Sequence, residues 1–340
     1  MKSFYLIEEE EEKTPILISE TNYLVFKSDN MEKISNSSGD SLLLDDVIVE
    51  ENWGWIYSNF SRTKLIWKRT LYSISYIFQS FCFIISLFMN NNYMQPVKAP
   101  FSIDPYFKMV TWCFVLLMGF PFLRVIYSNS VSGINILSWS INLLYLPVYF
   151  LLSFLFIHRA VSGVNGNPIM DDIVLGFAMI LTLIIYYRVK YKDDGRYKVG
   201  IIELLGVQVH FSALLACLLV EICESVFRTC SRYHDADKMD SKLFGWSYSN
   251  WSILVIILTC WTGSLILYLY KDVFYAGVMS FTYFGIYSVQ ERYFCYRDDT
   301  ECNDSVGKAS IIMASILLFF ILITIITYPK LVLYSVRRNS

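Results

Sequence analysis

Long runs of apolar residues constrain the fold of this chain more than any other feature of its sequence. An α-helix that crosses the roughly 30 Å hydrocarbon core of a bilayer needs about 20 mostly apolar residues, and in lipid its backbone amides must be bonded internally. Runs of this length recur at 71–89, 109–127, 137–157, 169–187, 200–222, 251–270, 272–290 and 309–328. The sequence therefore predicts an all-α fold, a polytopic membrane bundle of about eight transmembrane helices.

The sixth and seventh runs are separated only by Lys271 and the Asp272 that opens the second of them. As one helix, the combined stretch of 40 residues would be about 60 Å long at 1.5 Å per residue, which is twice the thickness of the hydrocarbon core. A tight hairpin between two spans is the better interpretation.

Composition agrees with a chain whose main partner is the lipid bilayer. Hydrophobic residues make up 55% of the chain and charged residues only 17%, whereas soluble domains have about 45–50% and 25%. No basic patch of the kind that binds nucleic acid is present. The chain opens on an acidic segment that includes the run Glu8 to Glu12, unlike a secretory signal, which begins with basic residues. We interpret residues 1–60 as a disordered acidic cytosolic tail that could bind protein partners, and 61–335 as the transmembrane bundle.

Basic residues near the ends of the spans predict the orientation, because short cytosolic loops carry an excess of Lys and Arg. Three basic clusters precede the first span, connect the fourth to the fifth and follow the last. They are Arg62, Lys64, Lys68 and Arg69; Arg188, Lys190, Lys192, Arg196 and Lys198; and Lys330, Arg337 and Arg338. With eight spans all three fall on one side, so both ends of the chain are predicted to face the cytosol.

The opposite loops carry features of an oxidising lumen. Cys295 and Cys302 lie in the loop between the last two spans, with the glycosylation sequon Asn303-Asp304-Ser305 directly after them. We predict that these two cysteines form a disulfide, either with each other or with Cys230 of the neighbouring luminal loop. Asn303 is the predicted glycosylation site.

One face of the fifth predicted span gathers ionisable groups. At 100° per residue a sector of about 60° contains Glu203, His210, Cys217, Glu221 and Glu224. Ionisable groups in a membrane usually face a bundle interior or a watery cavity, so this stripe could relay protons or bind a cation. A simpler alternative places Glu203 at the cytosolic helix end, Glu221 and Glu224 in the lumen, and His210 alone as a buried, hydrogen-bonded side chain. The acidic pair Asp171 and Asp172 precedes the apolar part of the fourth span, and we interpret it as an N-terminal cap favoured by the helix dipole rather than as a substrate site.

Catalytic and cofactor motifs are not found. The chain has only three histidines, too few for a membrane di-iron centre, and it has no Gly-rich phosphate loop. We therefore predict no enzyme, cofactor or metal site, and the sequence gives no oligomeric state. The first functional hypothesis is a small-solute or ion transporter or channel, with linkage to protons as one form of it. The alternatives are a non-catalytic scaffold or assembly factor acting through the tail, and thirdly a receptor-like protein. Several short apolar runs favour the endoplasmic reticulum or another internal membrane over the plasma membrane or vacuole.

Overall fold

The computed structural model describes residues 62–89, 100–127, 141–162, 167–191, 202, 204–233, 242–291 and 304–328. The chain divides into two units, Met1–Leu65 and Ile66–Ser340, and apart from the first turn of the first helix everything below belongs to the second. The predicted acidic tail, 1–60, lies outside the described residues.

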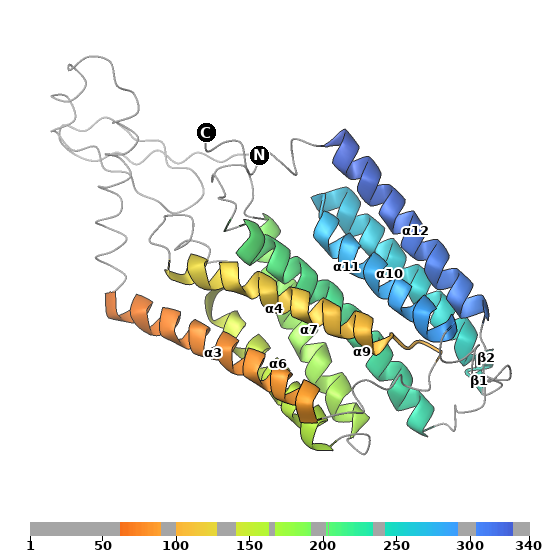
Figure 1. Ribbon diagram of the computed structural model, residues 1–340, viewed down its shortest axis with the longest axis horizontal. Coiled ribbons are helices and arrows are strands. Elements are labelled where there is room, and N and C mark those ends of the chain that lie inside the picture. Colours follow the sequence, from red (N-terminus) through yellow and green to blue (C-terminus); the bar gives the residue numbers. More distant parts are fainter. Residues whose placement is uncertain are drawn as a thin grey trace, which may run out of the picture. The chain divides into compact units, whose positions relative to one another are not determined.

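The described chain is almost entirely helical, as the sequence predicts (Figure 1). The long helices are α3 (Arg62–Met89), α4 (Pro105–Tyr127), α6 (Tyr145–Ser162), α7 (Pro168–Tyr191), α9 (His210–Tyr233), α10 (Tyr248–Tyr270), α11 (Val273–Val289) and α12 (Asp304–Thr327). A 3-10 turn, Asn142–Leu144, leads into α6, and a π-helix, Leu204–Val209, leads into α9. The strands β1 (Lys242–Leu243) and β2 (Trp246–Ser247) form a short antiparallel hairpin directly before α10.

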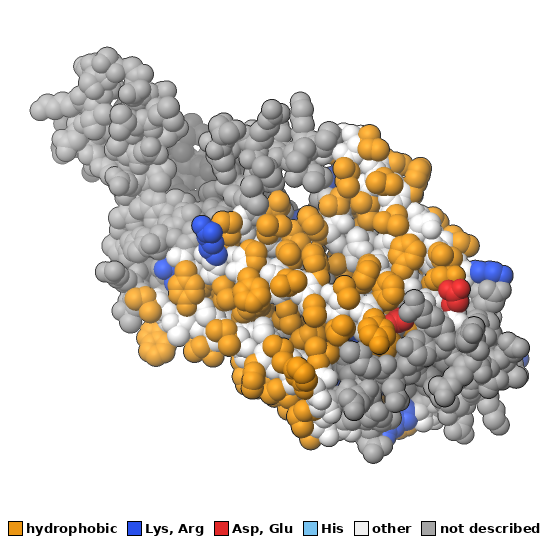
Figure 2. Space-filling view, viewed as in Figure 1, with side chains coloured by type: hydrophobic (Ala, Val, Ile, Leu, Met, Phe, Trp, Pro, Cys, Tyr) orange, Lys and Arg blue, Asp and Glu red, His pale blue; other side chains and the backbone are white. Residues whose placement is uncertain are grey.

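Seven of the helices in the described residues are long and apolar enough to cross a membrane, and α11 is a shorter apolar helix of 17 residues. The space-filling view is correspondingly covered by hydrophobic side chains along the helices (Figure 2). Large apolar side chains such as Phe88 and Trp261 are well exposed, as lipid-facing residues are. The chain is a multi-pass membrane protein.

Helix α9 is the central helix of the bundle. In its most apolar stretch 78% of the residues are buried, against 22% in α12, and it packs against α4, α7 and α11. The predicted span 200–222 stops well short of the observed helix end at Tyr233. The reason is that Glu221 and Glu224, the first charged residues beyond 220, are buried against partners on other helices.

The predicted hairpin between the sixth and seventh spans is confirmed. Lys271 ends α10 in a left-handed conformation (φ 53°), and the Asp272 side chain caps α11 by accepting a hydrogen bond of 3.1 Å from the Tyr275 backbone amide. The third predicted span, 137–157, is displaced: its α-helix begins at Tyr145 and continues to Ser162. Pro147 lies in the first turn of this helix, where its missing amide hydrogen leaves no helical bond unmade.

Close approach between α4 and the π-helix depends on one glycine. A Cβ at Gly206 would lie 2.4 Å from the Phe122 backbone nitrogen and 2.5 Å from the carbonyl carbon of Pro121. Only a residue without a side chain allows these two backbones to touch. This contact brings α9 against α4 in the orientation that builds the site described next.

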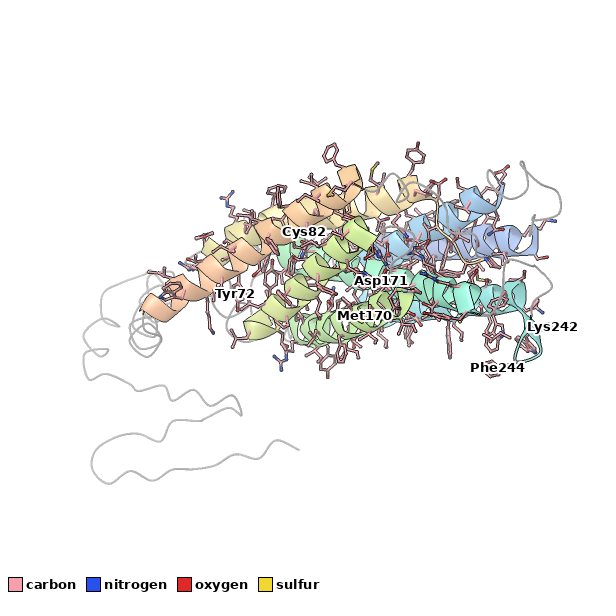
Figure 3. All side chains as sticks on the ribbon, turned by 90° about the horizontal axis from the view of Figure 1, so that it is seen from below. Tyr72, Cys82, Met170, Asp171, Lys242 and Phe244 are labelled. Atoms are coloured by element: carbon pink, nitrogen blue, oxygen red, sulfur yellow. The ribbon has the colours of Figure 1, made fainter. Side chains whose placement is uncertain are left out.

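At the end of α9 that lies away from Gly206, the chain continues into the β-hairpin, which turns at Phe244 and Gly245, both with positive φ. Phe244 is 88% exposed and lies at the tip, beyond the start of α10 (Figure 3). The Trp251 indole donates a 2.9 Å hydrogen bond to the Leu243 carbonyl and so ties the hairpin to α10.

Candidate functional site

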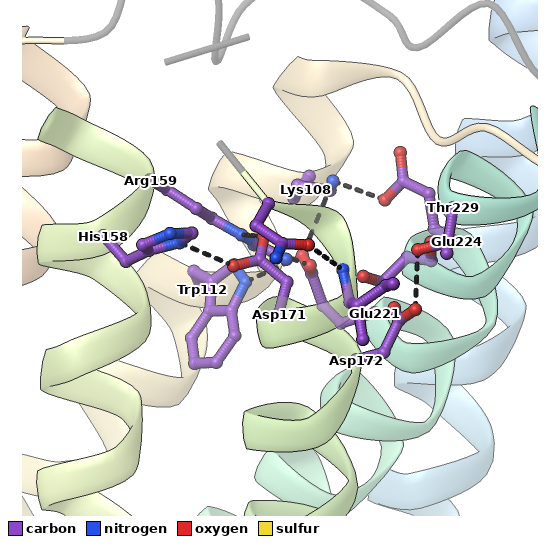
Figure 4. A network of polar contacts seen from close by, with 12 residues as sticks. Lys108, Trp112, His158, Arg159, Asp171, Asp172, Glu221, Glu224 and Thr229 are labelled. Atoms are coloured by element: carbon purple, nitrogen blue, oxygen red, sulfur yellow. Dashed lines mark hydrogen bonds and ion pairs between the residues drawn. The ribbon is translucent and has the colours of Figure 1, made fainter. Parts of the chain in front are cut away.

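Donors from two helices converge on the Glu221 carboxylate of α9 (Figure 4). Trp112 of α4 donates its indole N–H to Oε1 at 3.1 Å, and the Lys108 ammonium of the same helix lies 3.6 Å from that oxygen. Arg159 of α6 donates through Nη1 to Oε2 at 3.0 Å. Glu221 is only 2% exposed, so both of its oxygens are held by protein donors inside the bundle.

Each of the two cations also holds a second carboxylate. Arg159 donates through Nε to Asp171 of α7 at 2.9 Å, and Lys108 is paired with Glu224 of α9. The Asp171 carboxylate in addition lies 3.0 Å from the His158 ring nitrogen Nδ1. We call Lys108, Arg159, Asp171, Glu221 and Glu224 the ion network.

The ion network holds two cations and three carboxylates, a net charge of −1 when His158 is neutral. None of the five side chains belongs to a residue more than 8% exposed. Charges removed from water are costly unless each is paired and hydrogen-bonded, and every member here has at least one charged partner. The pairing explains how five ionised groups are accommodated among membrane helices.

Helix direction brings these residues to one end of the bundle. Lys108 and Asp171 lie in the first turns of α4 and α7, whereas Arg159 lies in the last turn of α6. Consecutive membrane helices run in opposite directions, so the starts of α4 and α7 lie level with the end of α6. The positions of Asp171 and Arg159 also suit the helix dipole, which favours acids at N-termini and bases at C-termini.

The predicted capping role of Asp171 and Asp172 is wrong. The α7 N-terminus is capped by Asn167, whose side chain accepts from the Ile169 amide at 3.1 Å. Asp172 instead accepts a 2.6 Å hydrogen bond from Thr229 of α9. The two acids thus bind other helices, because Asn167, placed just before Pro168, already supplies the cap.

The structure divides the predicted stripe of the fifth span between two places. Glu221 and Glu224 join the ion network, and Cys217 is buried one turn before Glu221. His210 lies elsewhere, 11 residues or about 16 Å along the helix from Glu221, and Glu203 lies outside the described residues. Glu221 and Glu224 are each 2% exposed, so neither extends into water. The alternative that places this end of the helix in the lumen stays a prediction.

Lys108 and Arg159 were not among the predicted site residues. Each lies just outside a predicted apolar run, where a basic residue usually extends towards water. A usable signal was the presence of opposite charges at the same end of consecutive spans: the cations Lys108 and Arg159 against the acids Asp171 and Glu221. Such residues can be buried only when they pair with opposite charges on other helices, because an unpaired buried charge has a high free energy.

His210 is a buried, hydrogen-bonded side chain, as the simpler alternative predicts, and it binds a hydroxyl and a carbonyl of other helices. It is fully buried, with Nδ1 3.0 Å from the Val115 carbonyl of α4 and Nε2 bonded to the Tyr149 hydroxyl of α6. A carbonyl only accepts, so Nδ1 carries the hydrogen and Nε2 of the neutral ring accepts from Tyr149. The ring also stacks on Phe122. All hydrogen-bonding positions of the neutral imidazole are therefore filled.

Another buried acid, Asp272, lies at the opposite end of α7 and α9. Besides capping α11, it accepts hydrogen bonds from Tyr186 (2.9 Å) and Ser212 (2.5 Å) and pairs with Lys190 at 3.2 Å. These contacts attach the α10–α11 hairpin to α7 and α9.

Three of the predicted modification sites, Cys295, Cys302 and Asn303, lie outside the described residues and remain predictions. Cys230, the alternative disulfide partner, is a free thiol. Among the described residues, no group of three or more His, Cys, Asp or Glu side chains is arranged to hold a metal ion.

No protein-family model matches the chain, and no curated protein or solved structure matches it either.

Proposed function

We propose that the protein is a transporter or channel for a small solute or an ion. In this proposal the charged part of the solute, or the ion, passes through the ion network as it crosses the bundle. The observation that carries this proposal is the burial of Glu221 between Lys108 and Arg159, donors on two different helices of a membrane bundle. Ionisable residues inside membrane segments most often mark the path of a substrate, ion or proton.

A purely structural role does not explain why the bundle contains such a network of buried charges. Membrane helices associate well through small residues and close packing, and replacing buried ion pairs with apolar residues is often neutral or stabilising. A chain that only needed to hold four helices together would gain little from five buried charges. Movement of a charge through the bundle requires side chains that can exchange their ion-pair partners. Glu221 shares Lys108 and Arg159 with other carboxylates, so such an exchange is available to it.

Neither alternative gains support from a described contact. The scaffold hypothesis depends on residues 1–60, which lie outside the described residues. Span length does not favour the endoplasmic reticulum, since six of the seven long apolar helices in the described residues have 23 residues or more. The cellular membrane is therefore not part of the proposal.

Flux into liposomes containing the purified full-length protein tests the proposal. The probes are protons, followed with an internal pH-sensitive dye, and labelled sodium, potassium, chloride, succinate and choline. At least one probe should enter faster than into protein-free liposomes. In the variant Glu221→Gln that rate should change by about tenfold or more, because one charged hydrogen-bond partner is worth about 1.5–3 kcal/mol.

Glu291→Gln is the matched control, since Glu291 is exposed at the end of α11 and lies outside the ion network. It should leave the flux unchanged. Both variants must elute as single species with melting temperatures close to that of the parent protein. If no probe enters faster than into empty liposomes, the transport proposal is wrong. Equal flux in the parent and in a folded Glu221→Gln protein would remove the ion network from the pathway.

A further inference from the structure

The groups around Glu221 form a cradle for a carboxylate. A guanidinium, an ammonium and an indole N–H, from Arg159, Lys108 and Trp112, surround its two oxygens at 3.0–3.6 Å. All three groups are donors only, and two of them are cations. Such a set binds a planar anion with two oxygens, and in the described structure Glu221 fills that position.

Glu221 is the one carboxylate of the ion network that contacts both cations. If it left the cradle, Arg159 would keep Asp171 at 2.9 Å, and Lys108 would keep Glu224. Each cation would therefore still have a carboxylate of its own. Asp171 and Glu224 each contact only one of the two cations in the described contacts, so neither lies between Arg159 and Lys108 as Glu221 does.

We propose that the cradle of Lys108, Trp112 and Arg159 binds a carboxylate group of the transported solute, and that Glu221 is its built-in competitor, released when it takes up a proton. This inference rests on the proposed transport function and names its substrate class and coupling ion. In the step itself a hydronium ion gives its proton to one Glu221 oxygen, so that an O–H bond of hydronium breaks, an O–H bond to Glu221 forms and a water molecule is left. The solute carboxylate then takes over the ion-pair contacts, and no other covalent bond changes.

Charge balance predicts the stoichiometry. The ion network has a net charge of −1 with Glu221 ionised. Protonating Glu221 and binding one solute carboxylate restores −1, whereas binding the carboxylate without the proton would place −2 in the membrane interior. Burying uncompensated charge is costly, so one proton should accompany each carboxylate.

Several other titratable groups surround Glu221 and belong to the same equilibrium. They are Lys108 of α4, His158 and Arg159 of α6, Asp171 and Asp172 of α7, and Cys217 and Glu224 of α9. His158 contacts only Asp171 among the carboxylates, and that contact is not altered when Glu221 is released. Glu221 is thus the group whose protonation vacates the cradle.

Uptake of labelled carboxylates into proteoliposomes tests the inference, with succinate and gluconate as carboxylate probes and choline and inorganic phosphate as comparisons. Lowering the external pH by one unit should speed carboxylate uptake by up to about tenfold, since one proton binds per carboxylate. Glu221→Gln, which resembles the protonated side chain, should make uptake independent of external pH. Lys108→Met should abolish uptake, while Lys308→Met, at an exposed position of α12, should not.

A second measurement avoids variants altogether. Succinate should raise the melting temperature of the detergent-purified protein, and by more at lower pH, because a ligand that binds only the folded state stabilises it. A rise that is equal or larger at higher pH contradicts the proton-linked exchange.

The outcomes separate this inference from the proposed function. Movement of sodium, protons or choline without any carboxylate, or phosphate uptake as fast as carboxylate uptake, overturns the carboxylate cradle and leaves transport standing. Carboxylate uptake that stays pH-dependent in a folded Glu221→Gln protein removes Glu221 as the competitor. If no probe of either panel moves, transport itself is wrong, and the cradle with it.

Discussion

The replacement of Arg159 by methionine is the sharpest test of how the ion network is held together. Methionine keeps much of the apolar volume of the side chain but removes the guanidinium, which donates to Asp171 at 2.9 Å and to Glu221 at 3.0 Å. The net charge of the network would change from −1 to −2. Two charged hydrogen bonds at about 1.5–3 kcal/mol each give about 3–6 kcal/mol, close to the 3–5 kcal/mol typical of breaking a buried pair.

A loss of about 3–5 kcal/mol should lower the melting temperature by roughly 6–10 °C, at about 2 °C per kcal/mol for a large chain. The measurement is thermal unfolding of the detergent-purified protein at a fixed heating rate. Arg124→Met is the matched control: Arg124 is exposed near the end of α4, and a surface change of this kind is worth less than about 0.5 kcal/mol.

A second substitution isolates the electrostatic cause. Asp171→Asn added to Arg159→Met returns the net charge to −1, so the double variant should recover several degrees although it carries one more change. If Arg159→Met melts within about 2 °C of the Arg124→Met control, the ion pairs do not stabilise the bundle. If the double variant is less stable than Arg159→Met alone, the loss is one of packing rather than of charge balance.

Four further predictions concern positions outside the ion network. Gly206→Ala should abolish accumulation of folded protein, because the new Cβ would lie 2.4 Å from the backbone of α4. Gly277→Ala is the control: a Cβ there would meet nothing within 4 Å, so a thermal melt should show no change or a stabilisation of up to about 1 kcal/mol. Asp272→Ala should lower the melting temperature more than Asp272→Asn, since asparagine keeps the α11 cap; equal losses would assign the whole effect to the Lys190 pair. Tyr149→Phe should cost about 1–3 kcal/mol by leaving His210 Nε2 without a donor, and an unchanged melt would contradict that bond. Epitope tags at the two ends should both be digested by protease added to sealed microsomes, and protection of one end alone would require an odd number of spans.

The length and spacing of the apolar runs were enough to predict the helical class and the hairpin at Lys271 and Asp272. Lipid leaves no other way to satisfy backbone amides, and 40 residues are too many for one crossing. The position of His210 was predictable for a similar reason, because an unpaired imidazole in hydrocarbon is costly wherever it lies. Helix ends were less predictable: α9 continues to Tyr233 through charged residues that would end a span if they had no partners.

The sequence alone determined that this chain is a bundle of membrane helices and that the fifth predicted span carries an ionisable face. Which residues meet that face was decided only by the tertiary structure. Lys108 and Glu221 are 113 positions apart in the sequence, and their contact depends on the depth and rotation of α4 and α9, set in part by the backbone contact at Gly206. Periodicity assigns a residue to a helix face but not to a partner, because a partner depends on how two helices pack, and packing is a property of the whole bundle.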